Sequence, residues 1–206
     1  MASIYELKPA FQRLLRPMVN GLAQAGVTAN QITVAALVLS LGAGAIVAWA
    51  HGGETLLLLP GVLLVRMALN AMDGMLAREH NQKTALGAML NELGDAIADV
   101  GLYLPLAVVP GFDARLVVGV VILSILTEMT GVIGVQIGAS RRYDGPLGKS
   151  DRAFLFGLMG LLLGVHVPIE RAIPYVLVGM ILLLVLTIVN RGRRALEEIA
   201  VSGFKP

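Results

Sequence analysis

Six long apolar stretches, separated by short polar segments, constrain what this chain can fold into. They cover residues 32–50, 55–78, 84–109, 114–137, 153–167 and 172–189. Only 15% of the 206 residues are charged, against about 25% in soluble domains, and about 20 apolar residues suffice to cross a bilayer. The pattern predicts an all-α integral membrane protein, a single domain over residues 1–206 with six transmembrane helices between residues 32 and 190.

Residues 1–25 precede the first apolar stretch and predict an amphipathic helix. Apolar side chains recur there every three or four residues, at Leu7, Phe11, Leu14, Met18 and Leu22, which is the period of an α-helix. The opposite side carries basic and amide side chains. A basic amphipathic helix before a membrane span is typical of a helix in the membrane interface. We expect that position, with a soluble surface helix as the alternative.

The distribution of positive charge predicts the orientation. If the N-terminus is cytoplasmic, thirteen of the sixteen Lys and Arg residues lie on the cytoplasmic side. Arg115 and Arg171 lie outside, and Arg66 lies within an apolar stretch. Cytoplasmic segments of membrane proteins carry such an excess, so both termini are expected in the cytoplasm. Three aromatic residues are expected in a belt at the outer ends of their helices: Trp49, Tyr103 and Tyr175.

Polar and small side chains at helical spacing interrupt the second and third apolar stretches. Because an α-helix turns once in 3.6 residues, one face of the second carries Arg66, Asn70, Asp73, Gly74, Ala77 and Arg78. One face of the third carries Gly87, Asn91, Asp95 and Asp99. The short loop at residues 79–83 makes these helices antiparallel neighbours whose polar faces can meet. Polar groups in a membrane are costly and usually mark a working site, here in the cytoplasmic half.

The side chains in this set favour a hard cation. Carboxylate and amide oxygens suit Mg²⁺ or Mn²⁺ rather than zinc, and Arg78 offers a fork for phosphate. The chain has no cysteine, which excludes thiolate metal sites and thiol catalysis. Two structural explanations stay open: small residues packing between membrane helices, and an ion pair of Arg66 with Asp73 or Glu128. Each explains single residues but not the whole set with its spacing.

The spacing resembles the signature of the CDP-alcohol phosphotransferase (CDP-alcohol phosphatidyltransferase) family. That signature is Asp, two residues, Asp-Gly, two residues, Ala-Arg, eight residues, Gly, three residues, Asp, three residues, Asp. This chain matches it at Asp73, Gly74, Ala77, Arg78, Gly87 and Asp95. Asn70 and Asn91 stand where the first and third aspartates would be. The stretch from Thr28 to Thr33 is similar to the family's Thr-Pro-Asn motif, with Ala29 in place of proline.

The resemblance implies a reaction in phospholipid biosynthesis at the bacterial inner membrane. A phospho-alcohol group would pass from a CDP-alcohol, such as CDP-diacylglycerol, to an acceptor hydroxyl with release of CMP. By the same resemblance, Mg²⁺ or Mn²⁺ is held by Asn70, Asp73, Asn91 and Asp95, and Asp95 is the general base. The implied nucleotide contacts are Asn30, Gly74, Ala77, Arg78, Thr84 and Gly87.

The two asparagines change the expected cation site. Each keeps a carbonyl oxygen but removes one negative charge, and cation affinity depends on the charge of the ligands. We expect a weaker or single-cation site, with Glu92 or Asp99 as substitute ligands. Asp99 is the better placed of the two, although a hydrogen-bonded supporting role is the favoured interpretation for it. The same change leaves a second function open, a non-catalytic homologue that binds CDP-lipid or scaffolds a lipid pathway.

The basic segment between the fourth and fifth stretches is the candidate acceptor region. Gly148 and Lys149 resemble a family element near the acceptor pocket, and the candidate ligands are Arg141, Lys149 and Arg152. The expected acceptor is a small alcohol with or without a phosphate, and these three residues would bind it in the phosphorylated case. Cytoplasmic anchoring is the alternative explanation for the same charges. The resemblance implies a homodimer, membrane lipid as a partner and no nucleic acid. A transporter is disfavoured because paired broken helices are not evident.

Overall fold

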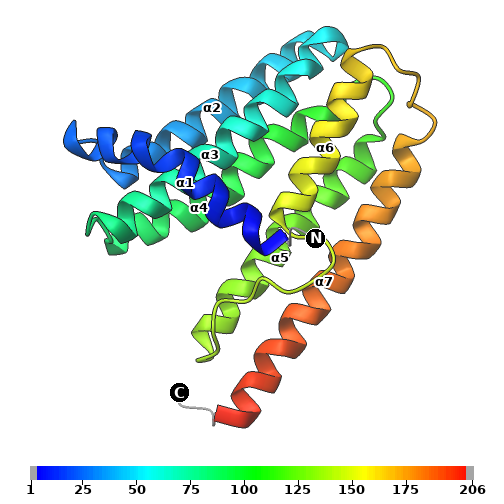
Figure 1. Ribbon diagram of the computed structural model, residues 1–206. Coiled ribbons are helices and arrows are strands. Elements are labelled where there is room, and N and C mark those ends of the chain that lie inside the picture. Colours follow the sequence, from blue (N-terminus) through cyan, green and yellow to red (C-terminus); the bar gives the residue numbers. More distant parts are fainter. Residues whose placement is uncertain (1–3, 203–206) are drawn as a thin grey trace.

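The computed structural model describes the backbone of residues 4–202 and the side chains of residues 10–201, and the regular secondary structure in this part is all helical. The elements are α1 (Ile4–Gln24), α2 (Ala29–Ala50), η1 (Gly53–Leu57), α3 (Leu58–Glu79), α4 (Ala85–Tyr103), η2 (Leu104–Val108), α5 (Ala114–Gln136), α6 (Lys149–Gly164) and α7 (Ile173–Ser202). Figure 1 shows α2 to α7 side by side in a bundle, with α1 crossing it. The predicted all-α class is confirmed.

Each of the six predicted apolar stretches contains one long α-helix. Within the described residues, four segments are long and apolar enough to cross a bilayer: Ala29–Ala50, Gly53–Glu79, Ala114–Gln136 and Ile173–Val201. Helix α4 carries three carboxylates within 19 residues, and α6 has only 16 residues. The count of six spans therefore stays a prediction for α4 and α6.

The start of α2 is fixed by a local capping motif. Thr28 Oγ1 accepts a hydrogen bond from the backbone N–H of Gln31 at 3.3 Å, and Gln31 Oε1 accepts one from the N–H of Thr28 at 2.9 Å. This reciprocal pair satisfies two N–H groups that a helix start leaves without partners. The N–H of Ala29 donates to Gln82 Oε1 at 2.7 Å. The loop between α3 and α4 is thereby tied to the start of α2.

Helix α2 packs against both α3 and α4, while α6 packs on α3 and α7 on α5. The approach of α2 to α4 depends on glycine, because a Cβ at Gly44 would overlap the carbonyl group of Gly101. Tyr103 is fully buried and stacks on Phe156, with ring centroids 4.2 Å apart. Its predicted place in an aromatic belt is wrong, because this ring fills the core between α4 and α6.

Helix α1 packs on α3 through only one edge of its apolar face. Leu15 and Val19 are buried with Met75 and Leu76, while Leu14 is 76% exposed. Met18, like Leu14, belongs to the predicted stripe and also faces outward. The apolar face of α1 is wider than its contact with α3, and the edge that carries Leu14 and Met18 is uncovered. This edge would contact lipid if α1 lies in the membrane interface, which stays a prediction. Leu7 lies outside the described side chains.

Candidate active site

The predicted polar faces of α3 and α4 meet through their side chains. Asn70 Nδ2 donates to Asp95 Oδ1 at 3.0 Å. One turn further on, Arg66 Nη1 donates to Asp99 Oδ1 at 2.6 Å, and Arg66 Nη2 donates to the carbonyl oxygen of Asp95 at 3.1 Å. Residue numbers that increase along α3 thus pair with residue numbers that decrease along α4, as in antiparallel neighbouring helices.

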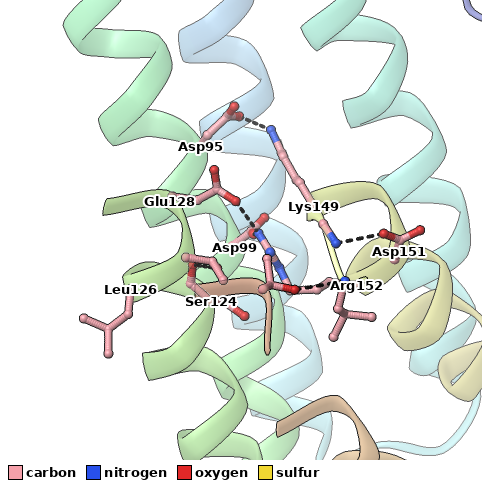
Figure 2. A network of polar contacts seen from close by, with 12 residues as sticks. Asp95, Asp99, Ser124, Leu126, Glu128, Lys149, Asp151 and Arg152 are labelled. Atoms are coloured by element: carbon pink, nitrogen blue, oxygen red, sulfur yellow. Dashed lines mark hydrogen bonds and ion pairs between the residues drawn. The ribbon is translucent and has the colours of Figure 1, made fainter. Parts of the chain in front are cut away.

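Asp95 also contacts a cation from the start of α6. Lys149 Nζ lies 2.5 Å from Asp95 Oδ1, and Arg66 Nη2 lies 3.6 Å from the same oxygen. Figure 2 shows the Lys149 side chain reaching Asp95. Lys149 was predicted as an acceptor ligand from the basic loop and its resemblance to a family element. The structure brings it to the residue predicted as the general base.

Asp73 is buried, and its carboxylate lies in different surroundings. Its Oδ2 atom accepts a hydrogen bond from Thr33 Oγ1 on α2 at 2.8 Å. Among the described residues it makes no ion pair. Thr33 is the last residue of the Thr28–Thr33 stretch, but the sequence did not predict this contact for it. A buried carboxylate without a countercharge favours a bound cation.

The donor set of the predicted cation site is reduced, as the two asparagines imply. Asp73 and Asp95 supply carboxylates, and Asn70 and Asn91 supply amide oxygens. Within the described part of the chain, no three Asp, Glu, His or Cys side chains form a metal-holding cluster. Two carboxylates with neutral oxygen donors fit one divalent cation, since Mg²⁺ commonly takes one or two carboxylates together with substrate phosphates.

Three of the predicted nucleotide-binding residues lie together where α2 and α4 begin. Thr84 Oγ1 accepts a hydrogen bond from the N–H of Gly87 at 2.9 Å and caps α4. A Cβ at Gly87 would lie 2.7 Å from Asn30 Oδ1 and 3.0 Å from Thr84 Oγ1. The glycine therefore permits a close approach of the three residues beside a helix N-terminus, which attracts phosphate.

The other nucleotide candidates lie at the end of α3. The exposed Arg78 folds its guanidinium over Gly74, where a Cβ would lie 3.0 Å from Nη2. Ala77 is half-buried beside them. The predicted residues thus form two groups, Asn30 with Thr84 and Gly87, and Gly74 with Ala77 and Arg78.

Glu128 on α5 is the centre of a group of arginines. Its carboxylate lies 3.3 Å from Arg141 Nη2, 3.1 Å from Arg152 Nη2 and 3.3 Å from Arg191 Nη1. The expected pairing of Arg66 with Glu128 or Asp73 is wrong, because Arg66 pairs with Asp99 and Asp95.

Arg152 was predicted as an acceptor ligand, but it is fully buried and does not reach the acceptor region. Figure 2 shows its guanidinium between Asp99 and Glu128, with 2.9 Å from Nη2 to Asp99 Oδ2. It lines neither cavity described below. Asp99 binds both Arg66 and Arg152, so it is hydrogen-bonded as the favoured interpretation expects, and its support of the cation site stays a prediction.

Two cavities meet at the start of α6. An apolar one of about 480 Å³ lies between α3 and α6, lined by Leu63, Leu64, Met67, Phe154, Leu158 and Leu161 among others, with Arg66 and Asn70 at its polar part. A polar one of about 340 Å³ is lined by residues that include Asn91, Glu92, Asp95, Glu128 and Arg141. Lys149 and Ser150 line both. The Asp95–Lys149 pair therefore stands between an apolar and a polar space.

The loop beside the polar cavity is fixed by Arg142. Its Nε lies 2.7 Å from Asp144 Oδ2, and its Nη1 lies 2.8 Å from Glu198 Oε2 on α7. Partial burial acts to raise the pKa of Asp144, but the hydrogen bond and charge of Arg142 outweigh it and hold that pKa below its ordinary value. Glu198 also accepts from the N–H of Ser140 at 2.9 Å. The loop is thereby anchored to α7.

A family comparison covers the helices that carry the candidate site. The model of the CDP-alcohol phosphatidyltransferase family matches residues 26–192, which include α2 to α6 and most of α7. The chain belongs to this family. It is 52% identical over 164 residues to the inner membrane protein YnbA of Escherichia coli, covering 80% of this chain and 82% of that one. It is 29% identical to the phosphatidylinositol phosphate synthase of Mycobacterium marinum, covering 91% and 80%.

Solved structures of this family share the fold. The phosphatidylinositol phosphate synthase PgsA1 of Mycobacterium tuberculosis with CDP-DAG bound superposes with a TM-score of 0.71 at 22% identity, covering 91% of this chain and 94% of that one. The same enzyme with manganese and citrate gives a TM-score of 0.74 at 20% identity, with 87% of each chain covered. At these identities the likeness establishes the fold alone.

Proposed function

We propose that this phosphatidyltransferase family member transfers a phosphatidyl group from CDP-diacylglycerol to the hydroxyl of a small alcohol and releases CMP. The observation that carries the proposal is the position of Asp95. Its carboxylate lines the polar cavity and contacts Asn70 and Lys149, which line the apolar cavity. A base at this boundary meets a lipid-borne phosphate on one side and a water-soluble alcohol on the other.

The apolar cavity supports a donor with acyl chains. Its volume of about 480 Å³ is bounded by aliphatic and aromatic side chains of α3 and α6. Arg66, Asn70 and Lys149 give it a polar part, where a pyrophosphate attached to the lipid would lie. The structural relative PgsA1, whose fold this chain shares, has been solved with CDP-DAG bound. The cytidine monophosphate part would then reach the groups around Gly87 and Arg78.

In the proposed reaction, Asp95 is the general base. The carboxylate accepts the proton of the acceptor hydroxyl, and the acceptor oxygen forms a bond to the phosphorus that carries diacylglycerol. The bond from that phosphorus to the bridging oxygen breaks, and CMP leaves with the bond electrons. Lys149 lies 2.5 Å from Asp95, so its ammonium would stabilise charge on the transferred phosphate.

Asp73 and Asp95, with the amide oxygens of Asn70 and Asn91, would hold one Mg²⁺ or Mn²⁺. When bound, the cation would neutralise charge on the pyrophosphate and its leaving group. The buried Asp73, which has no ion pair among the described residues, supports this role. Its hydrogen bond from Thr33 holds one oxygen of the carboxylate in place.

The same proposal places the protein in a bacterial inner membrane with both termini in the cytoplasm. The relation to an inner membrane protein of Escherichia coli supports the compartment. The positive-inside distribution supports the orientation. The site residues on α3, α4 and the α5–α6 loop would then be reached from the side where CDP-lipids and soluble alcohols meet.

The test is release of CMP by the full-length protein reconstituted in lipid vesicles. CDP-diacylglycerol labelled in the cytidine is supplied with a panel of small alcohols, with Mg²⁺, Mn²⁺ or a chelator. The proposal expects CMP and a new phospholipid, both dependent on the alcohol and the cation. Divalent-dependent binding of CDP-diacylglycerol without CMP from any alcohol would favour the non-catalytic homologue. The absence of both CDP-diacylglycerol binding and CMP release would contradict the proposed reaction.

A further inference from the structure

The cations that line the polar cavity are already paired with carboxylates. Lys149 lies 2.5 Å from Asp95, and Arg191 lies 3.3 Å from Glu128. Arg141 lies 2.7 Å from Glu92. Each of these three cations was available in principle to bind a phosphate on the acceptor. The proposed function assigns Lys149 to the transferred phosphate, so a phosphate on the acceptor would depend on Arg141 and Arg191, which are held by contacts within the protein.

Arg141 is the most fully engaged of the three. Its Nε and Nη2 donate to the two oxygens of Glu92 at 3.0 and 2.7 Å. Its Nη1 donates to the carbonyl oxygen of Glu128 at 3.1 Å. A guanidinium binds phosphate through the same pair of parallel N–H groups. Glu92 therefore occupies the edge of Arg141 that an acceptor phosphate would need.

Arg191 is positioned in a similar way by the protein itself. Its Nη1 donates to the carbonyl oxygen of Thr127 at 2.6 Å, and its Nε donates to that of Asp144 at 3.2 Å. The residue is buried. Turning the Arg191 side chain toward a ligand would break its hydrogen bonds to two carbonyl oxygens and its ion pair with Glu128. Each hydrogen bond lost inside a protein is costly in free energy.

The charge around the cavity leaves no surplus for a phosphate. Five carboxylates line it, from Glu92, Asp95, Asp99, Glu128 and Asp151, against three cations, from Arg141, Lys149 and Arg191. The buried Arg66 and Arg152 pair with Asp95, Asp99 and Glu128 from behind, which makes five cations for five carboxylates. The charge of the divalent cation proposed at Asp73 and Asp95 would be matched by the pyrophosphate of the donor. A phosphate dianion in a space of about 340 Å³ would lie close to displaced carboxylates, and like charges at such distances repel strongly.

We infer that the acceptor is a small polyhydroxy alcohol that carries no phosphate. This inference rests on the proposed function and assigns the substrate class of its acceptor site. Alcohol hydroxyl groups donate hydrogen bonds to carboxylate oxygens, and the half-exposed Glu92 and Asp95 present such oxygens to the cavity. Glu92 is the specificity residue, because its carboxylate both binds hydroxyl groups and withholds Arg141 from phosphate.

The first experiment uses matched acceptors on the reconstituted full-length protein. CMP release from CDP-diacylglycerol is measured with glycerol against glycerol 3-phosphate, and with inositol against inositol 1-phosphate. The inference expects kcat/KM at least tenfold higher for the unphosphorylated member of each pair. A preference for the phosphorylated member in either pair would overturn it. Failure of all four alcohols would count against the proposed function, and the second experiment would then decide the inference.

The second experiment measures binding without turnover, in the wild type, Glu92→Gln and the matched control Glu197→Gln. Glu197 is an exposed carboxylate paired with Arg193 on α7. Binding of glycerol 3-phosphate and of glycerol is measured by isothermal titration with CDP present. Glu92→Gln should bind glycerol 3-phosphate at least tenfold more tightly than the wild type, with glycerol changed less than threefold and the control unchanged. Equal weakening of both ligands, or tight phosphate binding by the wild type, would overturn the inference.

Discussion

Lys149 Nζ lies 2.5 Å from Asp95 Oδ1, which joins the first residue of α6 to the last carboxylate of the family signature. The contact crosses the boundary between the apolar and the polar cavity, since Lys149 lines both. A phosphate entering from the apolar side and a hydroxyl entering from the polar side would meet at this pair. The cation is therefore expected to act in the reaction and not only in anchoring the loop.

Replacement of Lys149 tests that role. Lys149→Gln should lower kcat/KM for CMP release by at least tenfold, because a positive charge at the transferred phosphate is lost. Lys149→Arg should restore part of the rate. Lys83→Gln, which removes an exposed lysine from the α3–α4 loop, is the matched control and should stay near the wild type. Equal rates for Lys149→Gln and Lys83→Gln would show that the contact only anchors α6.

Restoring the two missing carboxylates should strengthen cation binding. Asn70→Asp and Asn91→Asp each add a negative charge to the oxygen donors, and affinity for a hard cation follows ligand charge. The double variant should bind Mn²⁺ at least tenfold more tightly than the wild type, as measured by electron paramagnetic resonance of the free ion. Unchanged Mn²⁺ affinity would place the cation elsewhere than between these helices.

The nucleotide region should tolerate no side chain at Gly87. A Cβ there would lie 2.7 Å from Asn30 Oδ1, so Gly87→Ala should displace Asn30 and raise the KM for CDP-diacylglycerol at least fivefold. Gly61→Ala is the matched control in α3, because a Cβ at that position meets nothing within 4 Å. A KM for Gly87→Ala that equals that of the control would show that Asn30 and Gly87 do not contact the donor.

The buried arginine Arg152 should matter for stability far more than an exposed one. Its replacement by methionine leaves Asp99 and Glu128 with one cation fewer in a buried network, and losing one partner of a buried pair costs about 3 kcal/mol or more. Arg193→Met removes an exposed pair with Glu197, which is worth less than about 1 kcal/mol. Thermal unfolding in detergent should therefore separate the two variants clearly, and similar midpoints would contradict a structural role for Arg152.

Local features of the fold could be predicted from the sequence. The apolar stretches predicted the helices because burial in lipid requires long apolar segments. The facing of Asn70 and Asp95 also followed, because helical spacing and a short loop determine it.

Contacts between distant elements could not be predicted in this way. Glu128 attracts arginines from the α5–α6 loop, from α6 and from α7, and helical spacing says nothing about which helix lies opposite which. The same limit explains the wrong partner for Arg66 and the wrong place for Tyr103. Glu92 was considered only as a cation ligand, since its pairing with Arg141 depends on how a loop of the chain folds back.

The central claim is that Asp95 accepts the proton of an alcohol at this site. The most direct measurement is the rate of CMP release from CDP-diacylglycerol by Asp95→Asn beside the wild type and Glu197→Gln, all reconstituted in the same vesicles. Loss of a general base typically costs about 10²- to 10⁴-fold, so Asp95→Asn should fall by at least 100-fold while Glu197→Gln keeps the wild-type rate. CMP release by Asp95→Asn within threefold of the wild type would contradict the assignment.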